Sequence, residues 1–114
     1  IARNYKERTG TTKTSEEIVA AIKTDSDAMA VWNQAVDAIT LTCDWLMNSL
    51  SPQAFVFGGG LARSGDLLVK PIEDYLKSSL TFQRMPELKV AHYGAKAGTI
   101  GCAMIAFDAL KAEK

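Results

Sequence analysis

The chain has 114 residues, of which 47% are hydrophobic and 23% are charged, and this balance is typical of a globular protein with one core. Its 13 basic and 13 acidic residues cancel, which excludes the overall positive charge that drives non-specific nucleic-acid binding. No apolar run approaches the about 20 residues of a membrane span, and no signal peptide opens the chain. We therefore expect a soluble, cytoplasmic protein whose residues here bind neither nucleic acid nor membrane directly.

The first residues have the pattern of a helix that ends at Gly10. Ile1, Ala2 and Tyr5 have helical spacing, and glycine is the usual residue just after a helix. The sequence begins inside this pattern and without a methionine. We therefore expect residues 1–114 to be one part-domain of a longer protein, with the residues upstream of residue 1 missing.

Two further helices are predicted in the first half of the chain. Thr14 and Glu17 form a capping box that opens a short helix over residues 15–24. A long helix over residues 27–50 then keeps apolar residues on one face, which we interpret as core packing rather than as a cofactor site. This stripe consists of Trp32, Ala35, Val36, Ile39, Cys43, Leu46, Met47 and Leu50.

The second half alternates strands with helices. Residues 54–57, AFVF, form a continuous apolar run that predicts a strand covered on both faces, and three glycines follow it. Residues 67–80 have helical spacing, in which Pro71 predicts a kink or a division into two helices. Residues 88–93 alternate as a second strand would.

The last helix is predicted over residues 95–114. Its small residues gather on one face, where two glycines each cost about 1 kcal/mol relative to alanine. We therefore expect this face to pack closely on a neighbour, so that Gly101→Leu would overpack it and cost about 1–3 kcal/mol. The face consists of Gly98, Gly101, Cys102 and Ala106.

Few residues carry an obvious chemical motif. Cys43 and Cys102 have no second cysteine or histidine at the spacing of a metal site, so we predict two buried small hydrophobic residues. His92 has no acid or cysteine nearby, and we interpret it as a strand histidine with a local partner. Asp66 is the one acid beside the glycines, and its place in the first turn of a helix explains it better than a role as a catalytic base.

Gly58, Gly59 and Gly60 lie where a strand leads into a helix. Such a turn exposes backbone N–H groups, and glycine lets a ligand approach the main chain because no Cβ holds it away. The alternative is a tight turn in which crowding requires glycine. The dinucleotide fingerprint fails because Arg63 stands at the place of its third glycine, and a P-loop fails because Asp66 replaces its lysine.

Two separated blocks carry a resemblance to a known family. They are residues 54–80, AFVFGGGLARSGDLLVKPIEDYLKSSL, and residues 90–106, VAHYGAKAGTIGCAMIA. In order and spacing these blocks resemble the C-terminal half of the ROK family of repressors, open reading frames and sugar kinases, and most nearly its bacterial glucokinases. The resemblance covers about the last two-thirds of the chain, while the first third matches only in its helical pattern.

The resemblance implies an α/β fold with helices packed on a small sheet, the C-terminal lobe of an actin-like ATPase (ribonuclease H-like) fold. The full protein would hold ATP with Mg²⁺ between two lobes, phosphorylate a hexose such as glucose in glycolysis, and form a homo-oligomer. The implied nucleotide-binding residues are Gly58, Gly59, Gly60, Leu61 and Ala62.

Several family features have no match in these residues. The D-x-G-G-T phosphate loop, the aspartate base, the hexose-binding residues and the zinc motif would all lie upstream, so this segment alone is not expected to be catalytic. Ala95 and Lys96 stand where the family usually has an acidic or amide pair. Two alternatives to a kinase remain: the sensing and dimerisation lobe of a sugar-responsive repressor, and an interaction module unrelated to nucleotides.

Overall fold

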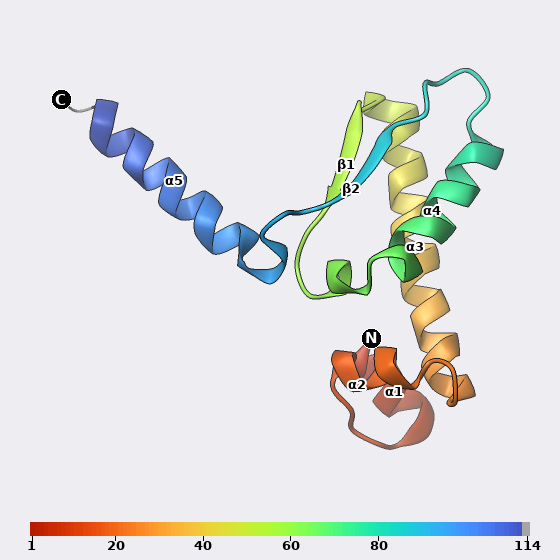
Figure 1. Cartoon of the computed structure of the whole chain (residues 1–114). Helices are drawn as coiled ribbons and strands as arrows, with labels where there is room; N and C mark the ends of the chain where they lie inside the picture. Colours follow the sequence, from red (N-terminus) through yellow and green to blue (C-terminus); the bar gives the residue numbers. More distant parts are fainter. Residues whose placement is uncertain (113–114) are drawn as a thin grey trace.

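A computed structural model describes residues 1–112, and the predicted order of helices and strands is confirmed in it (Figure 1). Two short 3₁₀ helices, η1 and η2, are additional. The last two residues of the predicted C-terminal helix lie outside the described residues. The elements are α1 (Ala2–Thr9), α2 (Ser15–Ala21), α3 (Ser26–Leu50), β1 (Ala54–Phe57), η1 (Leu61–Ser64), α4 (Asp66–Ser79), β2 (Glu87–Val90), η2 (Gly94–Lys96) and α5 (Ala97–Ala112).

The helix ends form as the local sequence predicts. Gly10 follows α1 in the left-handed conformation, with φ of 74°, and its N–H donates to the Lys6 carbonyl. The Thr14 side chain accepts from the Glu17 N–H, and the Glu17 side chain accepts in return from the Thr14 N–H. Both signals act over three or four residues, so the rest of the fold does not disturb them.

Asp25 joins α1, the loop before α2 and the start of α3. Its Oδ1 accepts from the Asp27 and Ala28 N–H groups at 3.0 and 3.1 Å, which caps α3. Its Oδ2 accepts from the Tyr5 hydroxyl of α1 at 2.6 Å and from Lys13 Nζ at 3.1 Å. The Tyr5 hydroxyl, the Ala28 N–H and Lys13 together hold the pKa of Asp25 well below its ordinary value.

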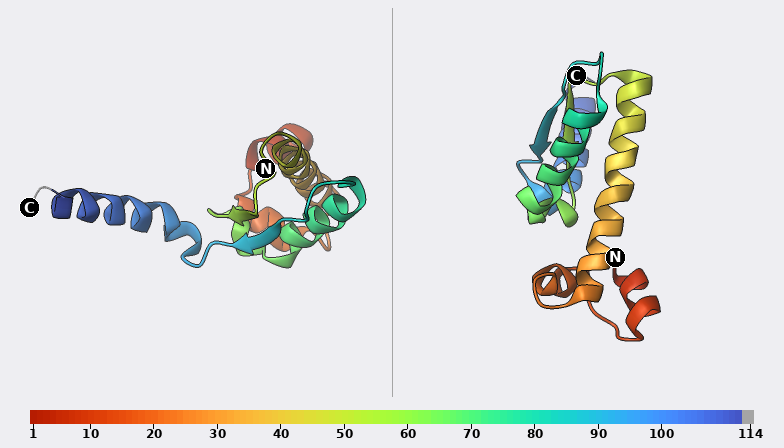
Figure 2. Two further views of the ribbon diagram at one scale, coloured as in Figure 1. Left: turned by 90° about the horizontal axis from the view of Figure 1, so that it is seen from above. Right: turned by 90° about the vertical axis from the view of Figure 1, so that its right-hand side faces the viewer.

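One face of α3 supplies the centre of the core. Its buried residues belong to one core with those of α1, α2 and α4. The right-hand view of Figure 2 shows α1 and α2 beside the start of α3, and α4 and the sheet farther along. Trp32, Val36, Cys43 and Met47 of the predicted stripe are buried, whereas Leu50 is 72% exposed. Cys43 is 4% exposed within this core, so its predicted burial is confirmed, and the same burial raises the pKa of its thiol.

The sheet consists of β1 and β2, which pair in parallel with Phe55 beside Leu88. Phe55, Phe57 and Leu88 pack against the core formed by α3 and α4. Val56 points to the other face and is 65% exposed. The prediction that residues 54–57 are covered on both faces is therefore wrong for the described chain, because its helices cover one face of the sheet.

The second strand and the helix before it also differ from prediction. β2 ends at Val90, and His92 lies in the following turn, where its ring meets the Tyr93 ring edge-on at 5.0 Å. The strand prediction for His92 is wrong, although the local partner is present. The division into two helices at Pro71 is wrong, because α4 continues as one helix through this exposed residue, where water can solvate the carbonyl that proline cannot bond. The kink, which is the other alternative, stays a prediction.

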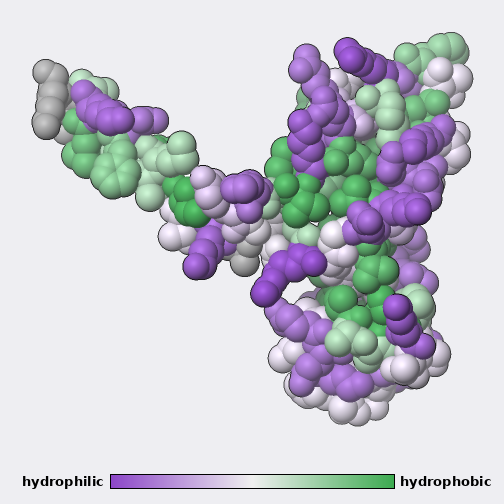
Figure 3. Space-filling model, viewed as in Figure 1, coloured by the Kyte–Doolittle hydropathy of each residue, from purple (hydrophilic) through white to green (hydrophobic). Residues whose placement is uncertain are grey.

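Helix α5 projects away from the rest of the molecule and has no buried residue (Figure 2). Hydrophobic side chains lie along its surface in Figure 3, among them Ile105 at 72% and Phe107 at 63% exposure. Cys102 is exposed, so its predicted burial is wrong. A Cβ added at Gly98 or Gly101 would meet no atom within 4 Å, so the predicted close packing of this face is also wrong for the described residues.

No helix within residues 1–112 combines the length and the apolar character that crossing a membrane requires.

The open surroundings of Gly101 reverse the expected effect of filling it. In the 114-residue chain, we expect Gly101→Leu to leave the free energy of unfolding unchanged or to raise it by up to about 1 kcal/mol, because leucine favours helix and meets no neighbour. Ala28→Leu is the control. Because Ala28 is fully buried, this variant should lose about 1–3 kcal/mol of unfolding free energy. Urea unfolding of both variants provides the measurement. If the two variants lose the same unfolding free energy, the exposure of α5 is contradicted.

The contacts of Asp25 predict a pH-dependent contribution to stability. Because its folded pKa lies below the ordinary 3.8, ionised Asp25 stabilises the fold above that value, and this stability is lost as the pH falls. Asp25→Asn should therefore have a lower melting temperature than the wild type at pH 7. The difference between the two melting temperatures should narrow between about pH 4 and pH 2. The exposed Asp37→Asn is the control. If the difference in melting temperature does not change with pH, the charge of Asp25 contributes nothing to the stability of the fold.

Candidate functional site

The glycine turn lies at the carboxyl ends of both strands. The Ala91 N–H, just after β2, donates to the Phe57 carbonyl at the end of β1, with an N···O distance of 2.8 Å. A Cβ built on Gly58 would lie 3.8 Å from the Ala91 Cβ. The segment after β2 therefore borders the glycines, at the edge of a parallel sheet where α/β proteins bind ligands.

The three glycines have different backbone requirements. Gly59 has φ of 82°, a conformation that residues with a side chain rarely adopt. Gly60 has φ of −62° and ψ of −41°, which any residue adopts, and a Cβ there would meet nothing within 4 Å. The alternative interpretation, a turn that requires glycine, therefore explains Gly59 and leaves Gly60 unexplained.

Residues 61–65 connect the glycines to α4. Leu61 is half-buried against the core, and Ala62 is only 2% exposed as a whole residue, so neither its side chain nor its backbone is open to a ligand in the described structure. The N–H of Arg63 donates to the Gly60 carbonyl at 3.2 Å, which closes the turn of η1. Gly65 then adopts φ of 53°, and Asp66 stands in the first turn of α4 as predicted.

A groove of about 570 Å³ lies beside Gly60, between η1 and α2. These two elements face each other in Figure 1, and Gly60 is the one member of the glycine run that lines the groove. Gly58, Gly59 and Ala62 do not line it, although all three belong to the predicted nucleotide site. The lining residues are Ser15, Glu16, Val19 and Ala20 from α2, with Gly60, Leu61, Arg63 and Ser64.

Sequence reasoning missed the wall that α2 provides. The capping box located this helix correctly, but no local signal connects it to a turn about 40 residues later. The two walls lie next to each other only because α2 packs near the start of α3, with Ile18 and Ile22 in the core, while α4 packs in the same core. The groove is therefore a property of the tertiary structure.

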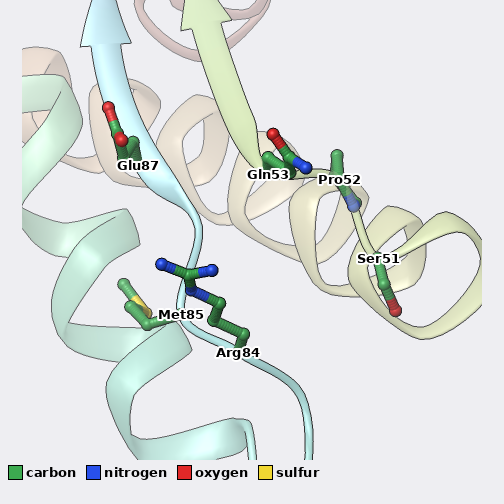
Figure 4. Close-up of a pocket in the computed structure, with 6 residues that line it drawn as sticks. All are labelled: Ser51, Pro52, Gln53, Arg84, Met85 and Glu87. Atoms are coloured by element: carbon green, nitrogen blue, oxygen red, sulfur yellow. The ribbon is translucent and has the colours of Figure 1, made fainter.

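A second hollow lies at the opposite end of the sheet, where β1 and β2 begin (Figure 4). It has a volume of about 200 Å³ and is lined mostly by polar residues, with the Arg84 guanidinium beside Met85 and the side chain of Ser51 pointing away. Its small size and its place at the amino ends of parallel strands make it a poorer candidate than the groove beside Gly60. Its lining residues are Ser51, Pro52, Gln53, Arg84, Met85 and Glu87.

Within residues 1–112, no three histidine, cysteine or acidic side chains gather as a metal site would need. Asp66 and His92 are both exposed, and no hydrogen bond in the described structure joins them to a second ionisable group. Asp66 and His92 therefore form no acid–base pair within the described residues.

Comparisons with known proteins agree with the two sequence blocks. The model of the ROK family matches residues 1–109. A glucokinase from Halalkalibacterium halodurans is 29% identical over 104 residues, which cover 89% of this chain and 31% of the relative. The chain thus spans about a third of the length of that curated relative. No solved structure matches the chain. Because the family model covers almost every residue, this chain belongs to the ROK family.

Proposed function

We propose that residues 1–114 form the nucleotide-side C-terminal lobe of an ATP-dependent sugar kinase that phosphorylates a hexose. Membership of the ROK family implies an actin-like ATPase fold, and the distant relative is a glucokinase. The parallel strands with helices on one face are compatible with one part of such a lobe. The homo-oligomer expected from the resemblance belongs to the same proposal, and the exposed apolar residues of α5 support an association.

The observation that carries the proposal is the backbone of Gly60. Neither its conformation nor its surroundings within the chain require glycine, yet it lines the groove. A missing side chain on the wall of a groove leaves bare main chain, against which a flat ring or a phosphate can lie. The half-buried Val19 and Leu61 provide apolar surface beside it, as ligand sites usually do.

The described residues would supply one part of the reaction. Phosphoryl transfer needs a base at the sugar hydroxyl, a Mg²⁺ that neutralises the phosphates, and precise positioning of both reactants. The groove can orient a nucleotide and exclude water from one side of it, and Arg63 places a positive charge at its edge. The described residues do not fit Mg²⁺, since they form no cluster of acidic ligands, so the chain's own contribution ends at the nucleotide.

Glycine 60 gives a direct test in the full-length protein. We expect Gly60→Val to weaken ATP binding at least tenfold, a loss of about 1.4 kcal/mol or more, because the branched side chain occupies the space of the ligand. The fold should tolerate the change, since the position has an ordinary φ and open surroundings. Calorimetric titration with ATP, corrected for the folded fraction of each protein, provides the measurement.

Sugar binding is the internal control for this experiment. Glucose should bind the variant as tightly as the wild type, since the hexose residues of the proposed kinase lie outside this chain. Equal dissociation constants for ATP in wild type and Gly60→Val would show that the glycines serve only to form a turn and do not contact the nucleotide. A full-length protein that binds sugar but neither binds nor hydrolyses ATP would favour the repressor instead.

A further inference from the structure

The two walls of the groove carry opposite charges that do not pair with each other. Glu16 projects from α2 and Arg63 from η1, and both side chains are exposed. Among residues 1–112, no hydrogen bond or ion pair joins the side chain of either residue to another group. Both side chains are therefore free to meet a ligand, one as an acceptor and one as a donor.

The apolar part of the groove lining suits the face of an aromatic ring. Val19 and Leu61 are half-buried, Ala20 is small, and Gly60 presents bare backbone. A ring placed between these surfaces buries its apolar faces and keeps its edge toward the polar side chains around them. An ionised carboxylate can only accept hydrogen bonds, so the ring edge beside Glu16 needs an N–H donor.

We propose that Glu16 is a specificity residue that accepts a hydrogen bond from the exocyclic amine of the adenine base. This inference rests on the proposed function, because it concerns the nucleotide of the same groove. A bound base shields the exposed Glu16 carboxylate from part of its water, so a base without the amine leaves the carboxylate without a donor on that side, and such unpaired polar groups discriminate against the analogue. Arg63, from η1 on the opposite wall, then has a positive charge available for the phosphates.

An alternative role for Glu16 is purely local. It stands in the first turn of α2 beside Glu17, where any acidic side chain interacts favourably with the helix N-terminus. Glu17 differs from it in one useful respect, since its side chain closes the capping box and does not line the groove. Glu17→Gln therefore removes the same charge from the same turn and keeps the cap, which makes it a matched control.

The test compares ATP with purine riboside 5′-triphosphate, which lacks only the amine, in calorimetric titrations of the full-length protein. We expect wild type and Glu17→Gln to bind ATP about tenfold more tightly than the analogue. Glu16→Ala should bring the two dissociation constants within about twofold, and Glu16→Gln should lie between because its amide still accepts a weaker hydrogen bond. Loss of a negative charge near the triphosphate affects both nucleotides alike, so it cancels in this ratio.

Each result decides the inference. An equal affinity of the wild type for both nucleotides, or an unchanged ratio in Glu16→Ala and Glu16→Gln, would overturn the role of Glu16. The same reduction in Glu17→Gln, whose side chain does not line the groove, would show that the ratio does not report a hydrogen bond to Glu16 and would also overturn it. In these cases the proposed function stands if Gly60→Val still blocks ATP. A wild type that binds neither nucleotide would overturn both proposals.

Discussion

Packing along one face of α3 is the constraint on which the rest of the structure depends. This helix is the longest of the described chain, and its buried residues continue from Ala28 to Met47. α1 and α2 pack against its beginning, while α4 and the sheet pack farther along, so the two groups are held in one core. The groove beside Gly60 exists because α2 comes from the first group and η1 leads into the second.

The polar contacts of Asp25 fix the helices at the beginning of α3. One carboxylate oxygen caps α3, and the other accepts from Tyr5 and Lys13, whose Nζ also lies 4.8 Å from the centre of the Tyr5 ring. Hydrogen bonds to a charged group are stronger than neutral ones and depend more on geometry. The position of the loop before α2, and with it one wall of the groove, is therefore linked to a single carboxylate.

Helix α5 shows that the described chain leaves apolar surface uncovered. Its exposed residues Met104, Ile105, Phe107 and Leu110 lie on more than one side, whereas a helix on the surface of a globular protein usually keeps them on one stripe. The outer face of the sheet is similarly open at Val56, beside an ion pair between Glu87 and Lys89. The glycines of α5 consequently have no close neighbour in the described residues, and their small size is not explained by packing there.

The sequence by itself determined what depends on neighbours within a few residues: the capping box at Thr14, the left-handed Gly10, the stripe of α3 and the order of helices and strands. Local patterns also located the glycine turn. Only the tertiary structure decided which face of β1 is covered, that Cys102 is exposed, and that Pro71 fits within a continuous α4. It also decided that α2 faces Gly60, because burial and grooves arise from contacts between residues far apart in the chain. Hydrophobic periodicity predicts which face of a helix or strand is apolar, but it does not predict which element packs against that face.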